Sequence, residues 1–225
     1  MKSHIVLEHI SKSYKMPYGL ITPLQDISIS IEKGERVAIM GPSGSGKTTL
    51  LSLLGCLERP TEGKYTFNGR SVEGYSENER SHLRGNELAF IFQDFQLIHE
   101  MTVLENVLMP FKYKDCSEDK EKKALMALEK VQLSHRLNHY PNQISGGEMQ
   151  RVAFARAIAS KPSLILADEP TGNLDSKNAE SILKLLLNEK DESTVIFVTH
   201  DEEIAHRFPR IIRLKEGKLA ADEKF

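Results

Sequence analysis

The chain has 225 residues, a formal net charge of −2 and a mixed 28% of charged residues. This length can bury the core of one domain, with room for a small inserted subdomain, and the balanced charge argues against nucleic acid as a partner. No stretch of the sequence is long and apolar enough to span a membrane, and no secretory signal is visible at Met1. We therefore expect a cytosolic chain in which Cys56 and Cys116 are reduced thiols.

The amino-terminal part of the chain predicts β-strands. Residues 5–10 form a short apolar strand, and residues 11–15 follow as a polar loop that carries Tyr14. Residues 24–31 alternate apolar and polar side chains, as a half-exposed antiparallel strand does. Residues 36–40 are almost continuously apolar, which suits a buried central strand. From these residues alone, Tyr14 either stacks on an adenine base or covers the edge of a sheet.

The stretch Gly41-Pro42-Ser43-Gly44-Ser45-Gly46-Lys47-Thr48 follows this central strand and opens an apolar, helix-compatible run at residues 50–57. It is the phosphate-binding P-loop pattern in its strand, loop and helix context. Its glycines allow the backbone to direct N–H groups at phosphate oxygens, and the following helix directs its positive dipole end to the same place. Lys47 is expected to reach the β and γ phosphates, and Thr48 to ligate Mg²⁺.

The middle of the chain changes from strands to helices. We predict a strand at residues 64–67 with a tight turn at Asn68-Gly69, a helix at 77–84 and a strand at 88–92. The last of these strands ends at Gln93. Residues 102–131 repeat apolar positions every 3.6 residues, so we expect a mainly helical subdomain inserted at about residues 94–160. Four apolar residues of a predicted loop either pack the core of the insertion or contact a partner protein: Phe95, Leu97, Ile98 and Met101.

The carboxyl-terminal part alternates helices and strands. The sequence predicts a Ser-Gly-Gly turn and a helix within residues 143–159, a strand at 164–167, a helix at 178–187, a strand at 194–198 and a closing hairpin at 210–221. Asp168 and Glu169 follow the first strand, and His200 follows the second. Ligands collect at the carboxyl ends of strands in open α/β sheets, so we expect these residues and Gln93 near the P-loop. Asp168 fits an Mg²⁺ ligand, and Glu169 fits the group that orients and deprotonates the attacking water.

The turn Ser145-Gly146-Gly147-Glu148 is a second predicted anion site. Exposed glycines at a helix N-terminus offer N–H groups to a phosphate, and the serine hydroxyl adds a donor. One chain would then hold two phosphate sites for one nucleotide. The simplest arrangement is a head-to-tail dimer in which each nucleotide lies between the P-loop of one subunit and the Ser-Gly-Gly turn of the other.

The order of these motifs resembles the ATP-binding cassette of ABC transporters over essentially the whole chain. The resemblance implies an α/β fold, in which a P-loop NTPase core with a mixed, mainly parallel sheet carries an antiparallel β subdomain and an inserted α-helical subdomain. Residues 1–225 would then form a single domain. The resemblance also implies that the chain binds ATP and Mg²⁺ and couples ATP hydrolysis to transport.

The resemblance assigns a role to each candidate site residue. Nucleotide contacts are implied for Tyr14, Gly41, Pro42, Ser43, Gly44, Ser45, Gly46, Lys47, Thr48, Thr49, Gln93, Ser145, Gly146, Gly147 and Glu148. Catalytic roles are implied for Glu169 and His200, with Glu169 as the general base. Mg²⁺ contacts are implied for Thr48, Gln93 and Asp168. Asn173-Leu174-Asp175 corresponds to the D-loop of the family.

Within the family, three stretches look like the lipoprotein-releasing and macrolide-efflux group: residues 41–47, residues 54–57 and residues 170–175. There the cassette serves a separate permease with a large extracytoplasmic domain. This implies an ATP-dependent homodimer held at the cytoplasmic face of the membrane by its permease. Peptides, lipoproteins, macrolides and haem-like compounds all stay open as substrates. A nucleotide-dependent switch that transmits force without transport has the same sequence features, whereas a DNA-repair or translation cassette usually needs a coiled-coil arm or a second cassette.

Overall fold

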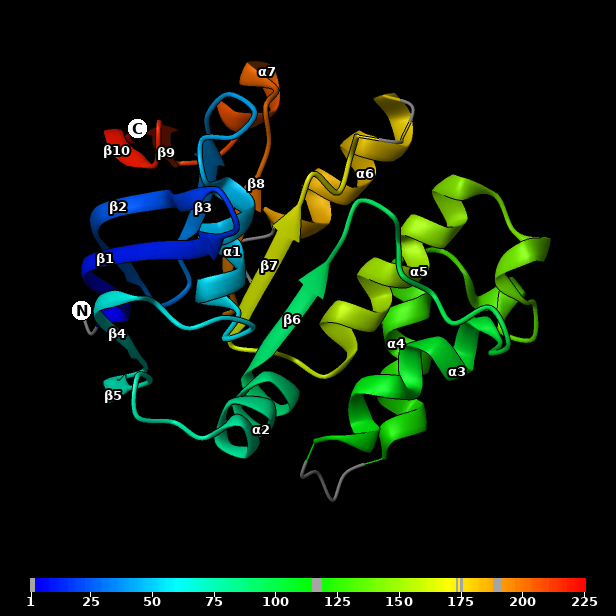
Figure 1. Cartoon of the computed structure of the whole chain (residues 1–225). Coiled ribbons are helices and arrows are strands. Elements are labelled where there is room, and N and C mark those ends of the chain that lie inside the picture. The colour runs from blue at the N-terminus through cyan, green and yellow to red at the C-terminus, as the bar shows by residue number, and fades with distance from the viewer. Residues whose placement is uncertain (1–2, 115–118, 173, 175, 188–191) are drawn as a thin grey trace. The chain divides into compact units, whose positions relative to one another are not determined.

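The computed structural model describes residues 3–114, 119–172, 174, 176–187 and 192–225. The chain forms two compact units, one built from Met1–Arg84 and Asp191–Phe225 and the other from Gly85–Lys190. In Figure 1 the first unit runs from blue to cyan and from orange to red, and the second is green and yellow. The second unit is therefore an insertion in the sequence of the first.

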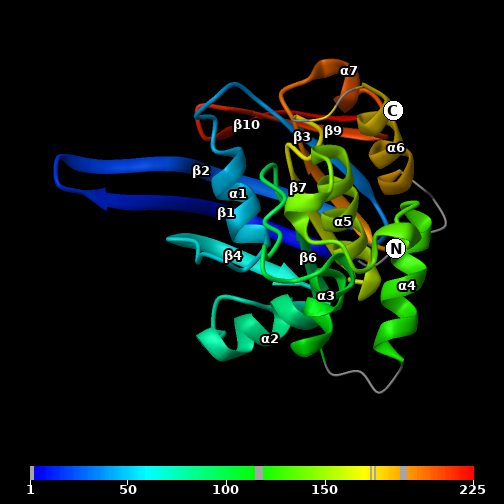
Figure 2. The same cartoon turned by 90° about the vertical axis from the view of Figure 1, so that its right-hand side faces the viewer.

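The first unit contains an antiparallel sheet in the order β2-β1-β4-β5. Its strands are β1 (Ser3–Met16), β2 (Gly19–Glu32), β4 (Glu62–Phe67) and β5 (Arg70–Ser71). Figure 2 shows β1 and β2 as a long hairpin. The polar loop predicted at residues 11–15 is wrong, because these residues continue β1 and pair with β2 as far as Met16 opposite Gly19. The turn predicted at Asn68-Gly69 joins β4 to β5.

The first unit also contains strands in the order β10-β9-β3-β8. Their bounds are β3 (Arg36–Met40), β8 (Thr194–Val198), β9 (Arg210–Lys215) and β10 (Lys218–Lys224). β3 runs parallel to β8 and to β9, whereas β10 and β9 form the predicted antiparallel hairpin. Every residue of β3 and β8 is buried, as a continuous apolar run predicts for a central strand. Two helices of this unit are α1 (Lys47–Leu54) and α7 (Glu202–Ala205), and α2 (Glu77–Glu87) contains the point in the sequence where the first unit gives way to the second.

The second unit combines a pair of parallel strands with a group of helices. β6 (Leu88–Ile91) pairs with β7 (Leu164–Asp168). The helices are α3 (Val103–Leu108), α4 (Lys120–Lys130), α5 (Gly146–Ala159) and α6 (Ser176–Leu186), with short 3-10 turns η1 (Met109–Lys112), η2 (Ser134–Arg136) and η3 (Pro141–Gln143). α3 and α4 pack against α5 (Figure 1), whose alanines and Phe154 are buried.

The structure therefore shows the α/β fold expected from the sequence, with parallel strands, an antiparallel sheet and a helical group. Among the described residues, no helix has the length and apolar character needed to cross a membrane.

Candidate functional site

The P-loop connects β3 to α1 and needs glycine at two close approaches. Gly41 has φ 155°, and a Cβ there would lie 2.3 Å from the Leu214 carbonyl oxygen. Gly46 has φ 99°, and a Cβ there would lie 2.4 Å from the Pro23 carbonyl oxygen. Any larger residue at either position would push the loop away from the sheet. The packing of the first unit thus requires glycine at two positions where the P-loop pattern has it.

Lys47 and Ser45 are P-loop residues whose polar side chains are buried. Lys47 is nearly buried, and its Nζ donates to the carbonyl oxygens of Gly41 at 2.8 Å and Pro42 at 3.0 Å. An ammonium has three donors, so these two bonds leave one for a ligand. Ser45 Oγ is buried and has no hydrogen-bond partner among the described residues. A buried hydroxyl without a partner is unfavourable, and a bound phosphate would supply an acceptor.

The N-terminus of α1 is open to an anion. Its N-cap residue is Gly46, which supplies no side-chain cap, and its first turn contains no acidic residue. The first N–H groups of a helix have no partner within the helix, and the dipole there favours negative charge. Thr48 is exposed on this first turn, and Thr49 is half-buried beside it. The loop and the helix end together fit the phosphates of a nucleotide.

Two further candidate residues lie in the first unit. Thr199 N donates to Ile39 O at 3.1 Å, which extends the pairing of β3 with β8. His200, the next residue, is exposed and therefore lies at the sheet edge where the P-loop begins. Tyr14 is half-buried on β1, and its hydroxyl donates to Glu58 Oε2 at 2.5 Å. The structure thus places the P-loop, His200 and Tyr14 in one compact unit.

Asp168, Glu169 and Gln93 meet at the carboxyl ends of two neighbouring strands in the second unit. Ile91 pairs with Ala167 in the parallel ladder of β6 and β7, so Asp168, the last residue of β7, and Gln93, two residues beyond β6, lie at the same edge. Asp168 and Glu169 are half-buried, and Gln93 is exposed. Two carboxylates and an amide at one edge provide oxygen ligands for a hard cation and a carboxylate base.

Ser145, Gly146 and Gly147 form the start of α5, as predicted, with Ser145 at the N-cap. The Ser145 hydroxyl accepts from Glu148 N at 3.3 Å and donates to Glu148 Oε2 at 3.0 Å. Hydrogen bonds from Ser145 and from Arg136 lower the pKa of the Glu148 carboxyl to about 2. The Ser145 hydroxyl has only one proton to donate, so donation to a phosphate would replace its bond to Glu148.

The loop at residues 94–101 is held by the helices of the second unit. Arg156 donates to the carbonyl oxygens of Phe95 at 2.8 Å and Gln96 at 2.6 Å, and Asn106 binds both the N–H and the carbonyl of Ile98. Leu97 is buried, whereas Phe95, Ile98 and Met101 are half-buried. The burial of Leu97 is thus explained by packing within the second unit. Asn173, Asp175 and Cys116 lie outside the described residues.

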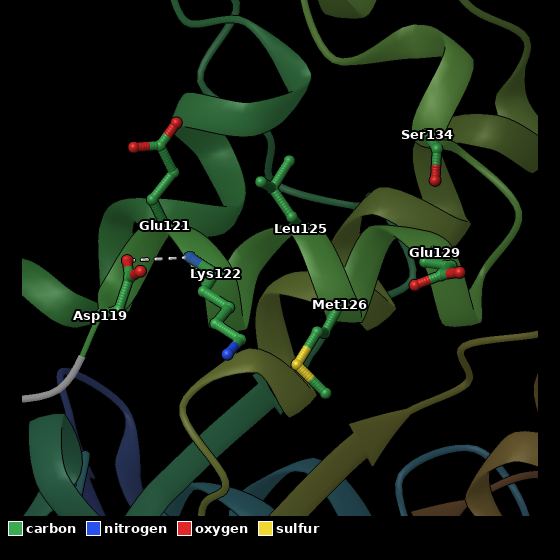
Figure 3. Close-up of a pocket in the computed structure, with 7 residues that line it drawn as sticks. All are labelled: Asp119, Glu121, Lys122, Leu125, Met126, Glu129 and Ser134. Atoms are coloured by element: carbon green, nitrogen blue, oxygen red, sulfur yellow. Dashed lines mark hydrogen bonds between the residues drawn. The ribbon is translucent and has the colours of Figure 1, made fainter.

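A surface hollow of about 340 Å³ lies beside α4 and contains none of the predicted site residues. Figure 3 shows its lining, which consists of Asp119, Glu121, Lys122, Leu125, Met126, Glu129 and Ser134. Most of these side chains are charged and exposed, and Asp119 Oδ1 accepts from Lys122 N at 3.1 Å as the helix cap. This hollow is therefore separate from the strand ends where the sequence predicts the chemistry.

Three contacts of the site were not predicted from the sequence. Lys12 and Glu58 surround Tyr14, and Arg136 pairs with Glu148 at 3.0 Å. Gln150 donates to the Pro170 carbonyl at 2.5 Å, next to Glu169. These pairs join residues from different elements, so no local sequence pattern marks them.

Comparison with known proteins identifies close relatives. The family model described as "ABC transporter" matches residues 24–172. The chain is 47% identical to the uncharacterized ABC transporter ATP-binding protein MJ0796 of Methanocaldococcus jannaschii, over 98% of this chain and 97% of the relative. It is also 47% identical to the macrolide export ATP-binding/permease protein MacB of Bdellovibrio bacteriovorus, over 98% of this chain. It spans only about a third of that longer protein, 34%.

Solved structures show the same fold. A dimeric structure of MJ0796 superposes with a TM-score of 0.90 at 45% identity and covers 98% of both chains. A dimeric post-hydrolysis state of MJ0796 bound to ADP and Pi superposes with a TM-score of 0.90 at 44% identity and the same coverage.

Proposed function

The chain belongs to the ABC transporter family, and we propose that it is the ATP-binding and ATP-hydrolysing subunit that drives a separate membrane permease. The observation that carries this proposal is the P-loop, in which three features fit phosphate groups: Lys47 Nζ, the start of α1 without a side-chain cap, and Ser45 Oγ, which has no hydrogen-bond partner within the described part of the chain. The dimeric ADP- and Pi-bound state of MJ0796 supports nucleotide hydrolysis by a dimer.

We assign nucleotide binding and metal binding to two groups of residues that share Thr48. Gly41 to Thr49 hold the phosphates, and the ring of Tyr14 supports the adenine base. Thr48, Gln93 and Asp168 would hold Mg²⁺, which neutralises charge on the phosphates when it is bound. Nucleotide enzymes commonly bind Mg²⁺ through one or two carboxylates plus phosphate oxygens, and Asp168 would be the carboxylate of this set.

The hydrolytic step uses residues that follow β7 and β8. Glu169 accepts the proton of the attacking water, and His200 at the end of β8 orients groups around the γ phosphate. Glu169 is half-buried at the strand end. Ser145, Gly146, Gly147 and Glu148 of a second subunit complete the phosphate contacts.

We propose a single-domain cassette over residues 1–225 with a helical insertion at about residues 94–160. The part of this insertion between Gln93 and Ser145 contacts the permease. The similarity to MacB, a macrolide export ATP-binding/permease protein, supports an exporter with a permease partner. We further propose that the cassette works at the cytoplasmic face of the membrane and that its permease has an extracytoplasmic domain. Two copies of the chain close around ATP and separate after hydrolysis, and this movement drives the permease.

Two substitutions test the assignment. Glu169→Gln should bind ATP but release phosphate at least about a hundredfold more slowly, because the positioned base is lost. Lys47→Ala should lose nucleotide binding. Glu121→Gln and Lys130→Ala change exposed residues of α4 and serve as matched controls with normal turnover. Near-normal phosphate release by purified Glu169→Gln would show that another group is the base.

A further inference from the structure

The backbone at Glu169 is strained. Its φ is 42°, in the left-handed region that residues other than glycine rarely adopt, and the next residue is Pro170. A proline further restricts the residue before it and favours extended backbone there. Strained backbone of this kind persists only where the surrounding structure holds it, and it is concentrated at functional sites. The contacts around Glu169 therefore show what keeps its side chain in place.

Three contacts hold the turn that follows Glu169. Gly172 N donates to Glu169 O at 3.1 Å and closes the turn across Pro170 and Thr171. The side chain of Gln93 lies against Gly172, since a Cβ on Gly172 would be 3.4 Å from Gln93 Nε2. The Gln150 side chain, from α5, donates through Nε2 to the Pro170 carbonyl at 2.5 Å. This last bond anchors the carbonyl one peptide beyond Glu169.

Gln150 is a polar residue on the buried side of α5. It is completely buried, as are its neighbours Val152 and Ala153. The Pro170 carbonyl can only accept, so the amide must direct Nε2 toward it. The Gln150 Oε1 atom is then buried with no hydrogen-bond partner in the part of the chain that the structure describes. A buried amide with one unsatisfied atom is costly to the stability of the fold, so a functional reason for burying Gln150 next to Pro170 is expected.

We propose that Gln150 is a positioning residue that holds the Pro170 carbonyl and so fixes the strained Glu169 backbone with its carboxylate directed at the attacking water. This rests on the proposed role of Glu169 as the base. Because α5 also begins at the Ser145-Gly146-Gly147 turn, one helix connects the second phosphate site to the base. A shift of α5 when the turn binds phosphate would reach Glu169 through Gln150.

The main test is Gln150→Met, which keeps the volume and removes the donor. In the purified full chain, kcat for ATP should fall by about tenfold to a hundredfold, because misplacement of a catalytic group by about 1 Å has effects of this size. KM for ATP should stay within about twofold, since the P-loop is unchanged. Val152→Ala creates a cavity beside the same helix and is the control for a loss of stability. The folded fraction of this variant should keep a normal kcat.

A double-mutant cycle separates this inference from the proposed function. If Gln150 acts through Glu169, then Gln150→Met should cause no further loss of kcat in the Glu169→Gln background. Normal turnover in Glu169→Gln alone would overturn the proposed role of Glu169 as the base. If Glu169→Gln is slow but Gln150→Met has a normal kcat, only the positioning role is overturned. The same holds if the losses of kcat in the two single variants add fully in the double variant, or if Val152→Ala loses as much kcat as Gln150→Met.

Gln150→Glu keeps the test decisive should Gln150→Met fold poorly. A protonated glutamic acid can donate to the Pro170 carbonyl, whereas a carboxylate cannot, and burial favours the protonated form. The ratio of the kcat of Gln150→Glu to that of the wild type should therefore fall as pH rises, with thermal melts confirming that the variant is folded at each pH. A ratio that does not change with pH would overturn the positioning role.

Discussion

At the scale of single residues, Tyr14 lies in a small polar network. Its hydroxyl donates to Glu58 Oε2, while Lys12 Nζ pairs with Glu58 at 2.9 Å and lies 4.9 Å from the centre of the Tyr14 ring. Desolvation, reinforced by the hydrogen bond to Glu58, raises the pKa of Tyr14 to about 12. The ring is therefore neutral at physiological pH and adds no negative charge near the phosphates. Its orientation is fixed at the hydroxyl end.

Substitution of Tyr14 distinguishes a base-stacking ring from one that only covers the sheet. Tyr14→Phe keeps the ring and should bind ATP within about twofold of the wild type, whereas Tyr14→Ala should weaken binding about tenfold or more, given the usual worth of a base-aromatic stack. Fluorescence titration with a labelled ATP analogue measures both. Equal affinities for Tyr14→Ala and the wild type would leave Tyr14 with a structural role only.

The sequence is informative about a residue when its chemistry is local. The P-loop could be predicted because the strand, the glycines and Lys47 are contiguous, and the structure shows why Gly41 and Gly46 are required. The bond between Tyr14 and Glu58 joins residues 44 apart in the chain, and no pattern predicts it. The bond between Gln150, part of the signature stretch at residues 144–150, and Pro170 was likewise not predicted, since the two residues are 20 apart in the chain.

At the scale of elements, α5 begins with a capping box that also contains the second candidate phosphate site. Glu148 accepts from Ser145 N at 2.9 Å, and its folded pKa of about 2 lies below the ordinary 4.5. A lowered folded pKa means that the charged carboxylate stabilises the fold above pH about 4.5. This contribution is lost as the pH falls from that value toward 2.

Replacement of Glu148 tests this cap. Glu148→Ala should lower the free energy of unfolding by about 1 kcal/mol at neutral pH, a typical effect for a lost helix cap. The difference between variant and wild type should narrow as the pH falls below about 4.5. Thermal melts between pH 3 and pH 7 measure it. Glu129→Ala, at an exposed position of α4, is the control. A difference in unfolding free energy between Glu148→Ala and the wild type that stays constant from pH 3 to pH 7 would contradict the link between the Glu148 charge and stability.

Element boundaries were predicted well where burial dominates. β3 and β8 are buried along their whole length, and their continuous apolar runs marked both ends. The end of β1 was missed because the polar residues after Ile10 are held in the strand by pairing with β2, which depends on the partner strand. The short helix α7 was also missed, since Asp201 caps only four residues.

At the scale of the whole molecule, the two phosphate-binding features belong to different parts of the chain. The P-loop lies in the unit of Met1–Arg84 and Asp191–Phe225, and the Ser145 turn lies in the unit of Gly85–Lys190. The sequence predicted a helical insertion from its 3.6-residue period, but a period gives no tertiary arrangement. The central claim is that ATP joins two copies of the chain, with charge-assisted hydrogen bonds from both.

The most direct test is the oligomeric state of Glu169→Gln by size-exclusion chromatography with light scattering. The variant should be a monomer without nucleotide or with ADP and a dimer with ATP, because slow hydrolysis preserves the shared ligand. Addition of Ser145→Arg should abolish the ATP-dependent dimer while P-loop binding of ATP persists, whereas Ser134→Arg, at an exposed serine beside α4, should leave the dimer intact. A double variant Glu169→Gln, Ser145→Arg that still dimerises with ATP would contradict the account.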